Sequence, residues 1–295
     1  MIASASEIVH SLGLGEFQVG RSHECDFPAS VLSLPVVTRP RFDVHGNSQE
    51  IDTRVRETLA TAGSVYEVLT DLLDPLEPTH ILTQTQCKVC AVSFDDVERA
   101  LSQSLKTRPT VVALEPNSLQ DIWDDIQRVA DRCGVSARGH ELVHNLKARM
   151  ANIAQRAQGT NIHKRVACIE WQEPLMAAGN WVPELIEMLG AVNLFGEAGK
   201  HSPWMSMDDL IAADPDVILV MPCGYGLAQT RDEMHWLEDR PQWKSLRGEV
   251  CLLDGNQYLN RPGPRVVESL QILAEILYPE SFPPLLGGGN GWERR

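Results

Sequence analysis

The sequence predicts an α/β protein with two similar lobes, each built on a parallel sheet, joined by one long connecting helix. Three observations predict this class. Strand-length apolar runs alternate with helical patterns, one segment has the pattern of a long amphipathic helix, and a weak internal repeat lies on either side of that segment. Continuous apolar runs separated by helices are typical of parallel strands that are buried on both faces.

The predicted strands are short apolar runs. They are "HILT" (80–83), "VVAL" (111–114), "RVACIEW" (165–171), "DVILVM" (216–221) and "EVCLL" (249–253). A helix that spans a bilayer needs about 20 apolar residues, and these runs are far shorter. We therefore expect no insertion into a membrane.

The connecting helix is predicted over residues 139–160. Leu142, Leu146, Met150, Ile153 and Ala157 follow one another there at spacings of three and four, with polar residues between them. This spacing gives a helix one apolar face.

The connecting helix divides the chain into predicted domains. We expect an N-terminal lobe over residues 1–138, a C-terminal lobe over 161–282 and a tail over 283–295. The tail is Gly-rich and has no periodicity, which predicts disorder.

The internal repeat consists of two pairs of similar segments. "SEIVHSLG" (6–13) matches "PELIEMLG" (183–190), and "DLLDPLEPTHILTQTQC" (71–87) matches "DDLIAADPDVILVMPCG" (208–224). A repeat of this length favours two similar lobes. In the second half a strand precedes the repeated helix, whereas only residues 1–5 precede it in the first half. We therefore expect a natural form of the chain to begin upstream.

Composition limits the partners and the compartment. The 40 acidic and 26 basic side chains give a net charge of -14, which repels nucleic acids. Seven cysteines spread over a long chain fit a reducing compartment, and the first residues lack the pattern of a secretory signal. The sequence as written is predicted to be cytoplasmic. It would be extracytoplasmic if an upstream signal has been omitted.

Catalytic motifs are mostly missing from the sequence. It contains no nucleophile elbow, no phosphate-binding loop and no dinucleotide fingerprint, which favours a protein that is not an enzyme. "HELVH" places His140, Glu141 and His144 at the spacing of a zinc hydrolase. This is the less favoured hypothesis, because the motif opens the connecting helix after polar residues. The alternative is that this segment is the solvated start of a helix, where an acidic residue in the first turn is favourable.

Several polar and aromatic residues follow predicted strands. His23 and Glu24 lie in "RSHECDF", after the strand-like "FQVG", and Trp171, Met176 and Trp181 surround the turn after residues 165–171. Loops at the carboxyl ends of strands are where α/β folds bind ligands, and aromatic rings suit a large planar ligand. A polar surface loop and ordinary core packing are the alternatives.

A rigid turn near the C-terminus carries further polar groups. In "NRPGPR" (260–265), Arg261 could meet an anionic group of a ligand. A solvated arginine in a surface turn is the alternative.

Four cysteines form a candidate metal site. The internal repeat places Gln86 opposite Cys223, so Cys87 and Cys223 each follow the end of a parallel strand, and Cys25 and Cys90 lie in nearby loops of the predicted fold. Four thiolates suit tetrahedral zinc or an iron-sulfur cluster. The alternative is that these are small buried residues, as free cysteines often are.

Three segments resemble a known family. "SASEIVHSLGLGEFQVGRSHECDFP" (4–28), "NWVPELIEMLGAVNLF" (180–195) and "LNRPGPRVVESLQILAEIL" (259–277) are similar to the helical-backbone (class III) substrate-binding proteins of ABC transporters, in the cobalamin-binding protein-like branch. The resemblance implies two α/β lobes, one rigid connecting helix and a ligand in the cleft between the lobes. Family members normally begin with an apolar strand before the Ser-Ala-Ser-Glu segment.

The resemblance also implies a function. The chain would be a non-catalytic binding protein for a corrinoid such as cobalamin, or for a related metal-containing ligand. The alternative is a cytoplasmic metalloprotein that uses the four cysteines on the same fold, and an ABC transporter would be a partner if an exported form exists. The residues expected to bind the ligand are Ser4, Ser6, His23, Glu24, Gln84, Gln86, Trp171, Met176, Trp181, Asn260 and Arg261.

Overall fold

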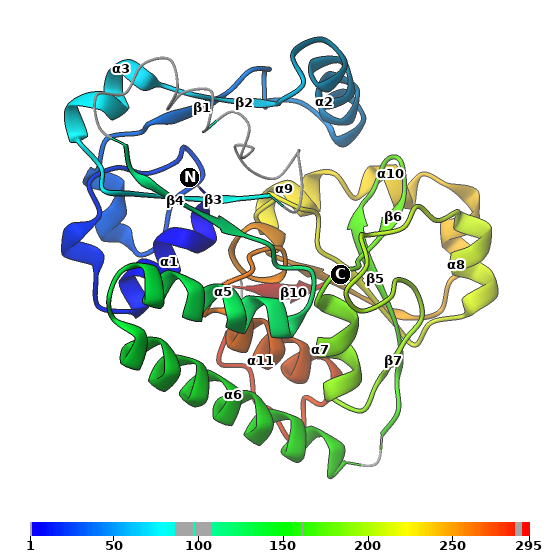
Figure 1. The fold of residues 1–295 in the computed structure, drawn as a ribbon. Coiled ribbons are helices and arrows are strands. Elements are labelled where there is room, and N and C mark those ends of the chain that lie inside the picture. Colours follow the sequence, from blue (N-terminus) through cyan, green and yellow to red (C-terminus); the bar gives the residue numbers. More distant parts are fainter. Residues whose placement is uncertain (1, 86–96, 98–107, 161, 287–290) are drawn as a thin grey trace. The chain divides into compact units, whose positions relative to one another are not determined.

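The chain forms two compact α/β units, which we call unit 1 and unit 2. The computed structural model describes residues 2–85, 97, 108–160, 162–286 and 291–295. Unit 1 comprises Met1–Pro116 and Gln120–His144, and unit 2 comprises Asn117–Leu119 and Asn145–Arg295. The division falls inside the helix that the sequence predicts to connect two lobes. The predicted α/β class is confirmed (Figure 1).

Unit 1 contains two small sheets and the helices packed on them. β1 and β2 are antiparallel and β3 and β4 are parallel, with His80 beside Thr110 and Gln84 beside Leu114. The elements are α1 (Ala3–Ser11), β1 (Thr38–Pro40), α2 (Ser48–Ala62), β2 (Tyr66–Val68), α3 (Thr70–Leu73), β3 (His80–Gln84), β4 (Thr110–Leu114) and α5 (Leu119–Arg132), with 3-10 turns at Gly15–Phe17, Ala29–Ser33 and Asp74–Leu76.

The core of unit 1 lies between its two sheets and α2 and α3. Val37, Val65, Leu73 and Ile81 are all buried in one cluster. Residues at both ends of α2 determine where this helix begins and ends. Asn47 and Glu50 form a reciprocal capping box at its start, and Gly63 ends it in the left-handed conformation with φ 72°.

The predicted connecting helix is α6 (Ser136–Gln158), which begins three residues before the predicted start. Leu146, Met150, Ile153 and Ala157 are buried, as their spacing predicts. Neither α6 nor any other helix in the described part of the chain is long and apolar enough to cross a membrane.

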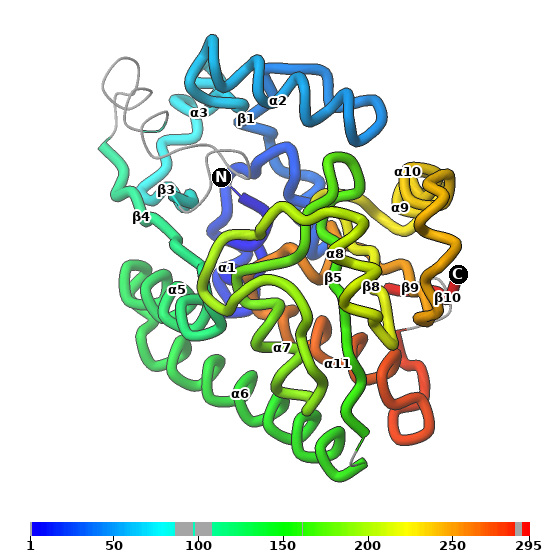
Figure 2. The backbone as a smooth tube through the Cα atoms, turned by 90° about the vertical axis from the view of Figure 1, so that its right-hand side faces the viewer, coloured from blue at the N-terminus to red at the C-terminus, as the bar shows by residue number. Residues whose placement is uncertain are grey.

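Unit 2 is built on a six-stranded sheet in the order β10-β9-β8-β5-β6, with β7 also paired to β5. β8 lies between β5 and β9 and is parallel to both (Figure 2). The elements are β5 (Arg165–Trp171), β6 (Met176–Ala177), α7 (Val182–Met188), β7 (Val192–Asn193), α8 (Met207–Ala213), β8 (Val217–Val220), α9 (Leu227–Asp232), α10 (His235–Glu238), β9 (Glu249–Leu253), α11 (Val266–Leu277) and β10 (Trp292–Arg294), with a 3-10 turn at Pro241–Ser245 and a π-helical turn at Gly255–Leu259.

The sheet of unit 2 is mixed rather than purely parallel. All four residues of β8 are buried, which explains its continuous Val-Ile-Leu-Val run. β6 and β10 are antiparallel to their neighbours, and each lies at one end of the strand order. The parallel prediction therefore holds for the central strands.

The prediction of disorder for residues 283–295 is wrong at its C-terminal end. Trp292–Arg294 form β10, which pairs with β9. The buried carboxylate of Glu275 on α11 accepts hydrogen bonds from the Trp292 indole at 3.1 Å and from the Leu285 backbone at 3.0 Å. These contacts join residues 10 and 17 positions apart, so the composition of the tail alone does not reveal them.

We predict that Trp292→Phe lowers the free energy of unfolding by about 1.5–3 kcal/mol. The variant keeps an aromatic ring but removes a hydrogen bond to a buried carboxylate, and hydrogen bonds to charged groups contribute about that amount. Urea unfolding followed by circular dichroism measures the change. Trp204→Phe is the matched control, because that ring is 58% exposed, and it should change the free energy by less than about 0.5 kcal/mol. Equal effects of the two substitutions would contradict the prediction.

Candidate functional site

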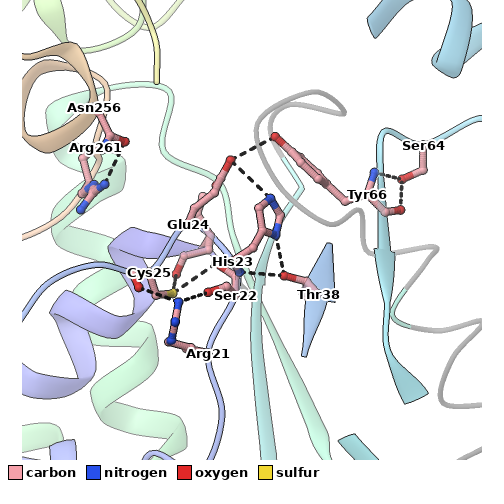
Figure 3. Close-up of polar contacts among 11 residues, drawn as sticks. Arg21, Ser22, His23, Glu24, Cys25, Thr38, Ser64, Tyr66, Asn256 and Arg261 are labelled. Carbon is pink, nitrogen blue, oxygen red and sulfur yellow. Dashed lines mark hydrogen bonds and ion pairs between the residues drawn. The ribbon is translucent and has the colours of Figure 1, made fainter. Parts of the chain in front are cut away.

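His23 is held in place by a single buried hydroxyl in unit 1. It lies in the loop between α1 and β1, and its backbone N–H donates to Oγ1 of Thr38 at 3.1 Å. Nδ1 of the His23 ring lies 2.8 Å from the same Oγ1 (Figure 3). Thr38 is fully buried at the start of β1. Backbone and ring of His23 are therefore fixed together.

Tyr66 and Glu24 complete a polar cluster around His23. The Tyr66 hydroxyl donates to Oε1 of Glu24 at 3.1 Å, and the Tyr66 ring lies 4.9 Å from the His23 ring, centroid to centroid. Tyr66 begins β2 and pairs with Pro40 of β1. The antiparallel pair β1–β2 thus positions both Thr38 and Tyr66.

The His23 imidazole is neutral at physiological pH. Burial, and then the positive charge of Arg21, lower the pKa of His23 to about 4. Nε2 of His23 lies 3.9 Å from Oε1 of Glu24. At pH 7 this approach is not an ion pair, because the ring carries no charge. A neutral imidazole keeps one nitrogen lone pair, which can serve as a metal ligand.

Cys25 lies beside this cluster and is enclosed by hydroxyl groups. Its Sγ is 3.1 Å from Oγ of Ser6 and 3.2 Å from Oγ of Ser22, and it donates to the Ile2 carbonyl at 3.6 Å. The side chain is buried. Arg21 donates to the Cys25 carbonyl at 3.1 Å. These contacts tie the loop to α1.

The predicted four-cysteine site draws its thiols from both units and from residues that the structure does not describe. Cys223 lies in unit 2 and is partly exposed. The predictions for Cys87 and Cys90 lie outside the described residues. Over the described ranges, no group of three or more His, Cys, Asp or Glu side chains is arranged to hold a metal ion.

The "HELVH" motif lies on the exposed face of α6. His140, Glu141 and His144 are all exposed in the first turns of that helix. A catalytic zinc site needs a third protein ligand beside the two histidines and an open position for water. The geometry around these three residues gives the zinc hydrolase hypothesis no support.

In unit 2 an aromatic pair follows two neighbouring parallel strands. Trp171 ends β5, and Tyr225 follows β8, with ring centroids 5.2 Å apart. The Trp171 indole donates to the Glu173 carbonyl at 3.0 Å. Burial raises the pKa of Tyr225, so its hydroxyl stays protonated. Trp171 was predicted from sequence and Tyr225 was not.

The remaining predicted residues of unit 2 differ in exposure. Trp181 is buried before α7, and its indole donates to the Leu259 carbonyl at 3.1 Å, as a core residue does. Met176 is partly buried in β6. Asn260 donates to the Met221 carbonyl at 2.9 Å.

Arg261 is almost fully buried and is held by a neighbouring side chain. It is 4% exposed and donates to Oδ1 of Asn256 at 3.1 Å (Figure 3). Gly255 makes this turn possible, because a Cβ there would lie 2.1 Å from the Pro222 carbonyl oxygen. The alternative that Arg261 is a solvated arginine in a surface turn is therefore excluded.

The predicted residues of unit 1 other than His23 and Glu24 lie on α1 and β3. Ser4 and Ser6 are buried on α1, and Ser6 accepts a hydrogen bond from Gln18 at 2.9 Å. Gln84 is buried at the end of β3. The prediction for Gln86 lies outside the described residues.

Sequence reasoning missed Thr38 and Tyr66, the two residues that hold His23 and Glu24. Thr38 lies in "VVTRP" and Tyr66 in "SVYEVL". Both read as ordinary strand residues, and no local pattern links them to positions 23 and 24. The signal that could have found them is the pairing of the two strands.

The chain thus has two α/β units, and the aromatic pair of unit 2 lies beyond the carboxyl ends of parallel strands, where α/β proteins bind ligands. Residues 28–247 match the family model described as periplasmic binding protein. The chain belongs to this family. The family resemblance predicted from the sequence is confirmed.

Two relatives are similar to this chain over most of their length. The chain is 22% identical over 281 residues to the vitamin B12-binding protein of Vibrio cholerae serotype O1, covering 92% of this chain and 86% of the relative. It is 20% identical over 290 residues to the uncharacterized ABC transporter substrate-binding lipoprotein YvrC of Bacillus subtilis, covering 96% and 80%.

Solved structures share the fold at low sequence identity. A periplasmic heme binding protein from Pseudomonas aeruginosa matches with a TM-score of 0.70 and 18% identity, covering 99% of this chain and 95% of that one. The periplasmic vitamin B12 binding protein BtuF of Vibrio cholerae matches with a TM-score of 0.64 and 17% identity, covering 96% of each chain. Neither the iron-sulfur nor the cytoplasmic prediction gains support from these proteins.

We predict that a nuclear magnetic resonance titration of His23 gives a pKa near 4. Arg21→Gln should raise this value, because it removes one of the two causes of the shift. A His23 pKa near 6.5 would contradict the prediction.

The same shift predicts a pH-dependent stability. A folded-state pKa below the unfolded value means that the unfolded chain binds the proton more tightly, so acid destabilises the fold. Relative to His23→Gln, the wild-type free energy of unfolding should fall by about 3 kcal/mol between pH 6.5 and pH 4. The contributions of other titrating groups cancel in this comparison because both proteins contain them. One such group is Asp125, because burial raises the pKa of its carboxyl to about 7. A difference that does not change with pH would exclude this role for His23.

Proposed function

We propose that this protein binds a cobalt corrinoid of the cobalamin type and that it serves as the substrate-binding component of an ABC transporter. The observation that carries the proposal is His23, a neutral imidazole fixed by Thr38 beside Glu24 and Tyr66. The similarity to a protein named vitamin B12-binding, over 92% of this chain and 86% of that protein, supports the choice of ligand. The similarity to a lipoprotein of the substrate-binding class supports the transporter partner and a role outside the cytoplasm.

His23 can act on such a ligand through one ring nitrogen. When Nδ1 is protonated, it donates a hydrogen bond to Oγ1 of Thr38, and Nε2 keeps its lone pair. Imidazole nitrogen is a common ligand of transition metals, and a hydrogen bond on the opposite ring nitrogen fixes the tautomer and the ring orientation. The low pKa means that protons do not compete with the metal for this nitrogen above about pH 5.

Two corrinoids that differ in the group bound to cobalt can test the role of His23. Diaquocobinamide carries water on the cobalt that an imidazole can replace, whereas the axial cyanide of cyanocobalamin exchanges poorly. We expect wild-type protein to bind both in calorimetric titrations, with quenching of tryptophan fluorescence. His23→Ala should weaken binding of diaquocobinamide by about 10- to 100-fold, the usual effect of losing a group that supports a metal site, and weaken that of cyanocobalamin less.

His235→Ala is the control for this prediction. His235 is exposed on α10 in unit 2, and its Nδ1 lies 3.0 Å from the Asp232 carbonyl. The control should bind both corrinoids as wild type does. The absence of heat and of fluorescence quenching with both corrinoids would overturn the proposal, and equal losses for both in His23→Ala would overturn the role of His23.

A haem-type ligand is the second candidate, and a specific observation favours it. Imidazole and phenol groups both serve as haem ligands, and the His23 and Tyr66 rings lie 4.9 Å apart. Solved structures with the same fold include proteins named as haem-binding. Titration with hemin, followed by its visible absorption, separates the two candidates. Saturable hemin binding without corrinoid binding would favour this second candidate.

A further inference from the structure

The C-terminal segment 291–295 contacts more of unit 2 than its neighbouring strand. β10 pairs with Cys251–Leu253 of β9, and the Arg295 backbone N–H donates to the Val250 carbonyl at 3.0 Å. The same segment also reaches α9, α10 and the start of the π-helical turn at Gly255–Leu259. We call residues 291–295 the C-terminal strap. The strap and these elements all belong to unit 2.

Two bidentate ion pairs join the strap to α9 and α10. Arg231 of α9 donates to both carboxylate oxygens of Glu293, at 2.8 and 2.6 Å. Arg295 donates to both carboxylate oxygens of Glu238 on α10, at 2.8 and 2.9 Å. These hydrogen bonds lower the pKa of both glutamate carboxyls, so both are ionised at pH 7. Two parallel charge-assisted hydrogen bonds fix the orientation of the groups as well as their distance.

Helix α9 begins directly after the turn that carries Tyr225. Gly226 is the N-cap residue of α9, and the Thr230 N–H donates to its carbonyl at 2.9 Å. The Tyr225 ring lies 5.2 Å from the Trp171 ring. α9 is six residues long, which is less than two helical turns. A displacement of this helix at Arg231 therefore also moves its first turn, next to Tyr225.

The backbone of the strap holds a second turn. The Gly291 carbonyl accepts a hydrogen bond from the Asp254 N–H at 2.9 Å. Asp254 is the N-cap residue of the π-helical turn at Gly255–Leu259. Its Oδ1 accepts from the Gln257 backbone N–H at 2.7 Å, and its Oδ2 accepts from the Gln257 side chain at 3.1 Å. The strap thus fixes the residue at which this turn begins.

Asn256 connects the π-helical turn to Tyr225 and to Arg261. Its backbone N–H donates to the Tyr225 carbonyl at 3.1 Å. Its Oδ1 accepts from the Arg261 guanidinium at 3.1 Å (Figure 3). Tyr225 lies beyond the carboxyl end of β8, and Arg261 is a residue for which the sequence predicts a ligand contact. The strap therefore reaches the Tyr225 turn by two routes, one through α9 and one through Asn256.

We propose that the C-terminal strap positions the two turns of unit 2 that carry Tyr225 and Arg261. Glu293 and Arg295 are the positioning residues, because their ion pairs hold α9 and α10 against β10. The Gly291 carbonyl holds the start of the π-helical turn. The turns thus keep one arrangement before a ligand binds, which lowers the entropy cost of binding. The link to ligand binding rests on the proposed function, whereas the positioning itself does not.

Glu293→Arg tests the strap directly. The variant places a cation beside Arg231, so the strap repels α9 instead of holding it. The Asn256 amide should exchange with solvent about tenfold faster than in the wild type, since losing an ion pair and adding a like-charge contact each shift a local opening equilibrium by a few-fold. The Leu219 amide, at the centre of the sheet, should keep its exchange rate. Hydrogen exchange followed by nuclear magnetic resonance measures both amides, and equal acceleration of the two would overturn the proposal.

A charge swap and a matched reversal keep this test specific. Glu293→Arg combined with Arg231→Glu restores an ion pair between the strap and α9, and it should restore slow exchange at Asn256. Glu249→Arg is the matched control, because Glu249 pairs with Arg294 at 2.7 Å and so joins the strap to β9 rather than to α9. The control should leave Asn256 exchange unchanged. Equal effects of the two single reversals would contradict a positioning role for Glu293.

Cyanocobalamin tests whether the positioned turn belongs to the binding site. Because only the closed turn is expected to bind, the ligand at about 100 times its Kd should slow Asn256 exchange by about 100-fold. The Thr160 amide is the reference and should not change, because Thr160 lies after α6, at the opposite end of β5 from Trp171. Unchanged Asn256 exchange in protein that binds cyanocobalamin would overturn the link to binding. Wild-type protein that fails to bind corrinoids would overturn the proposed function instead. The exchange rates of the ligand-free variants would then still decide whether the strap positions the turn.

Discussion

Parallel pairing of β8 with β5 and β9 is the constraint on which unit 2 depends. Parallel strands present their carboxyl ends at one edge of a sheet, so the turns after β5 and β8 lie side by side. Trp171 and Tyr225 meet for this reason, although 53 residues lie between them in the sequence. The burial of the whole of β8 makes its register specific, because a shift would expose apolar side chains.

In unit 1, burial determines the chemistry of the candidate site. His23 is placed by a fully buried hydroxyl and beside a cationic side chain, so its ring stays neutral at pH values where an exposed histidine begins to protonate. Glu24 is positioned by Tyr66 rather than by an ion pair with His23. The cluster therefore combines a nitrogen donor with a carboxylate and a phenol, groups that suit recognition of a metal-containing ligand.

The surroundings of the sheets differ between the two units. In unit 2, β10 covers the free side of β9, and a buried carboxylate on α11 anchors the approaching chain. In unit 1 an apolar groove runs beside β3. Strand edges and apolar grooves are surfaces that proteins normally cover, because they otherwise promote association.

The sequence by itself determined the α/β class, the central strands, the apolar face of α6 and the repeat, because these depend on short-range periodicity. Leu146, Met150, Ile153 and Ala157 are buried as their spacing requires. The sequence also drew attention to His23 and Glu24, but the strand expected before them is wrong, because Phe17 ends a 3-10 turn and the next strand is β1. Tertiary structure alone decided that Thr38 and Tyr66 hold them, that Trp181 is buried, that Arg261 is enclosed beside Asn256, and that Trp292 pairs into the sheet. The contacts of Thr38, Tyr66, Trp181 and Trp292 join residues at least 15 positions apart, which no local pattern encodes, and the Arg261 contact with Asn256 depends on the fold of their shared turn.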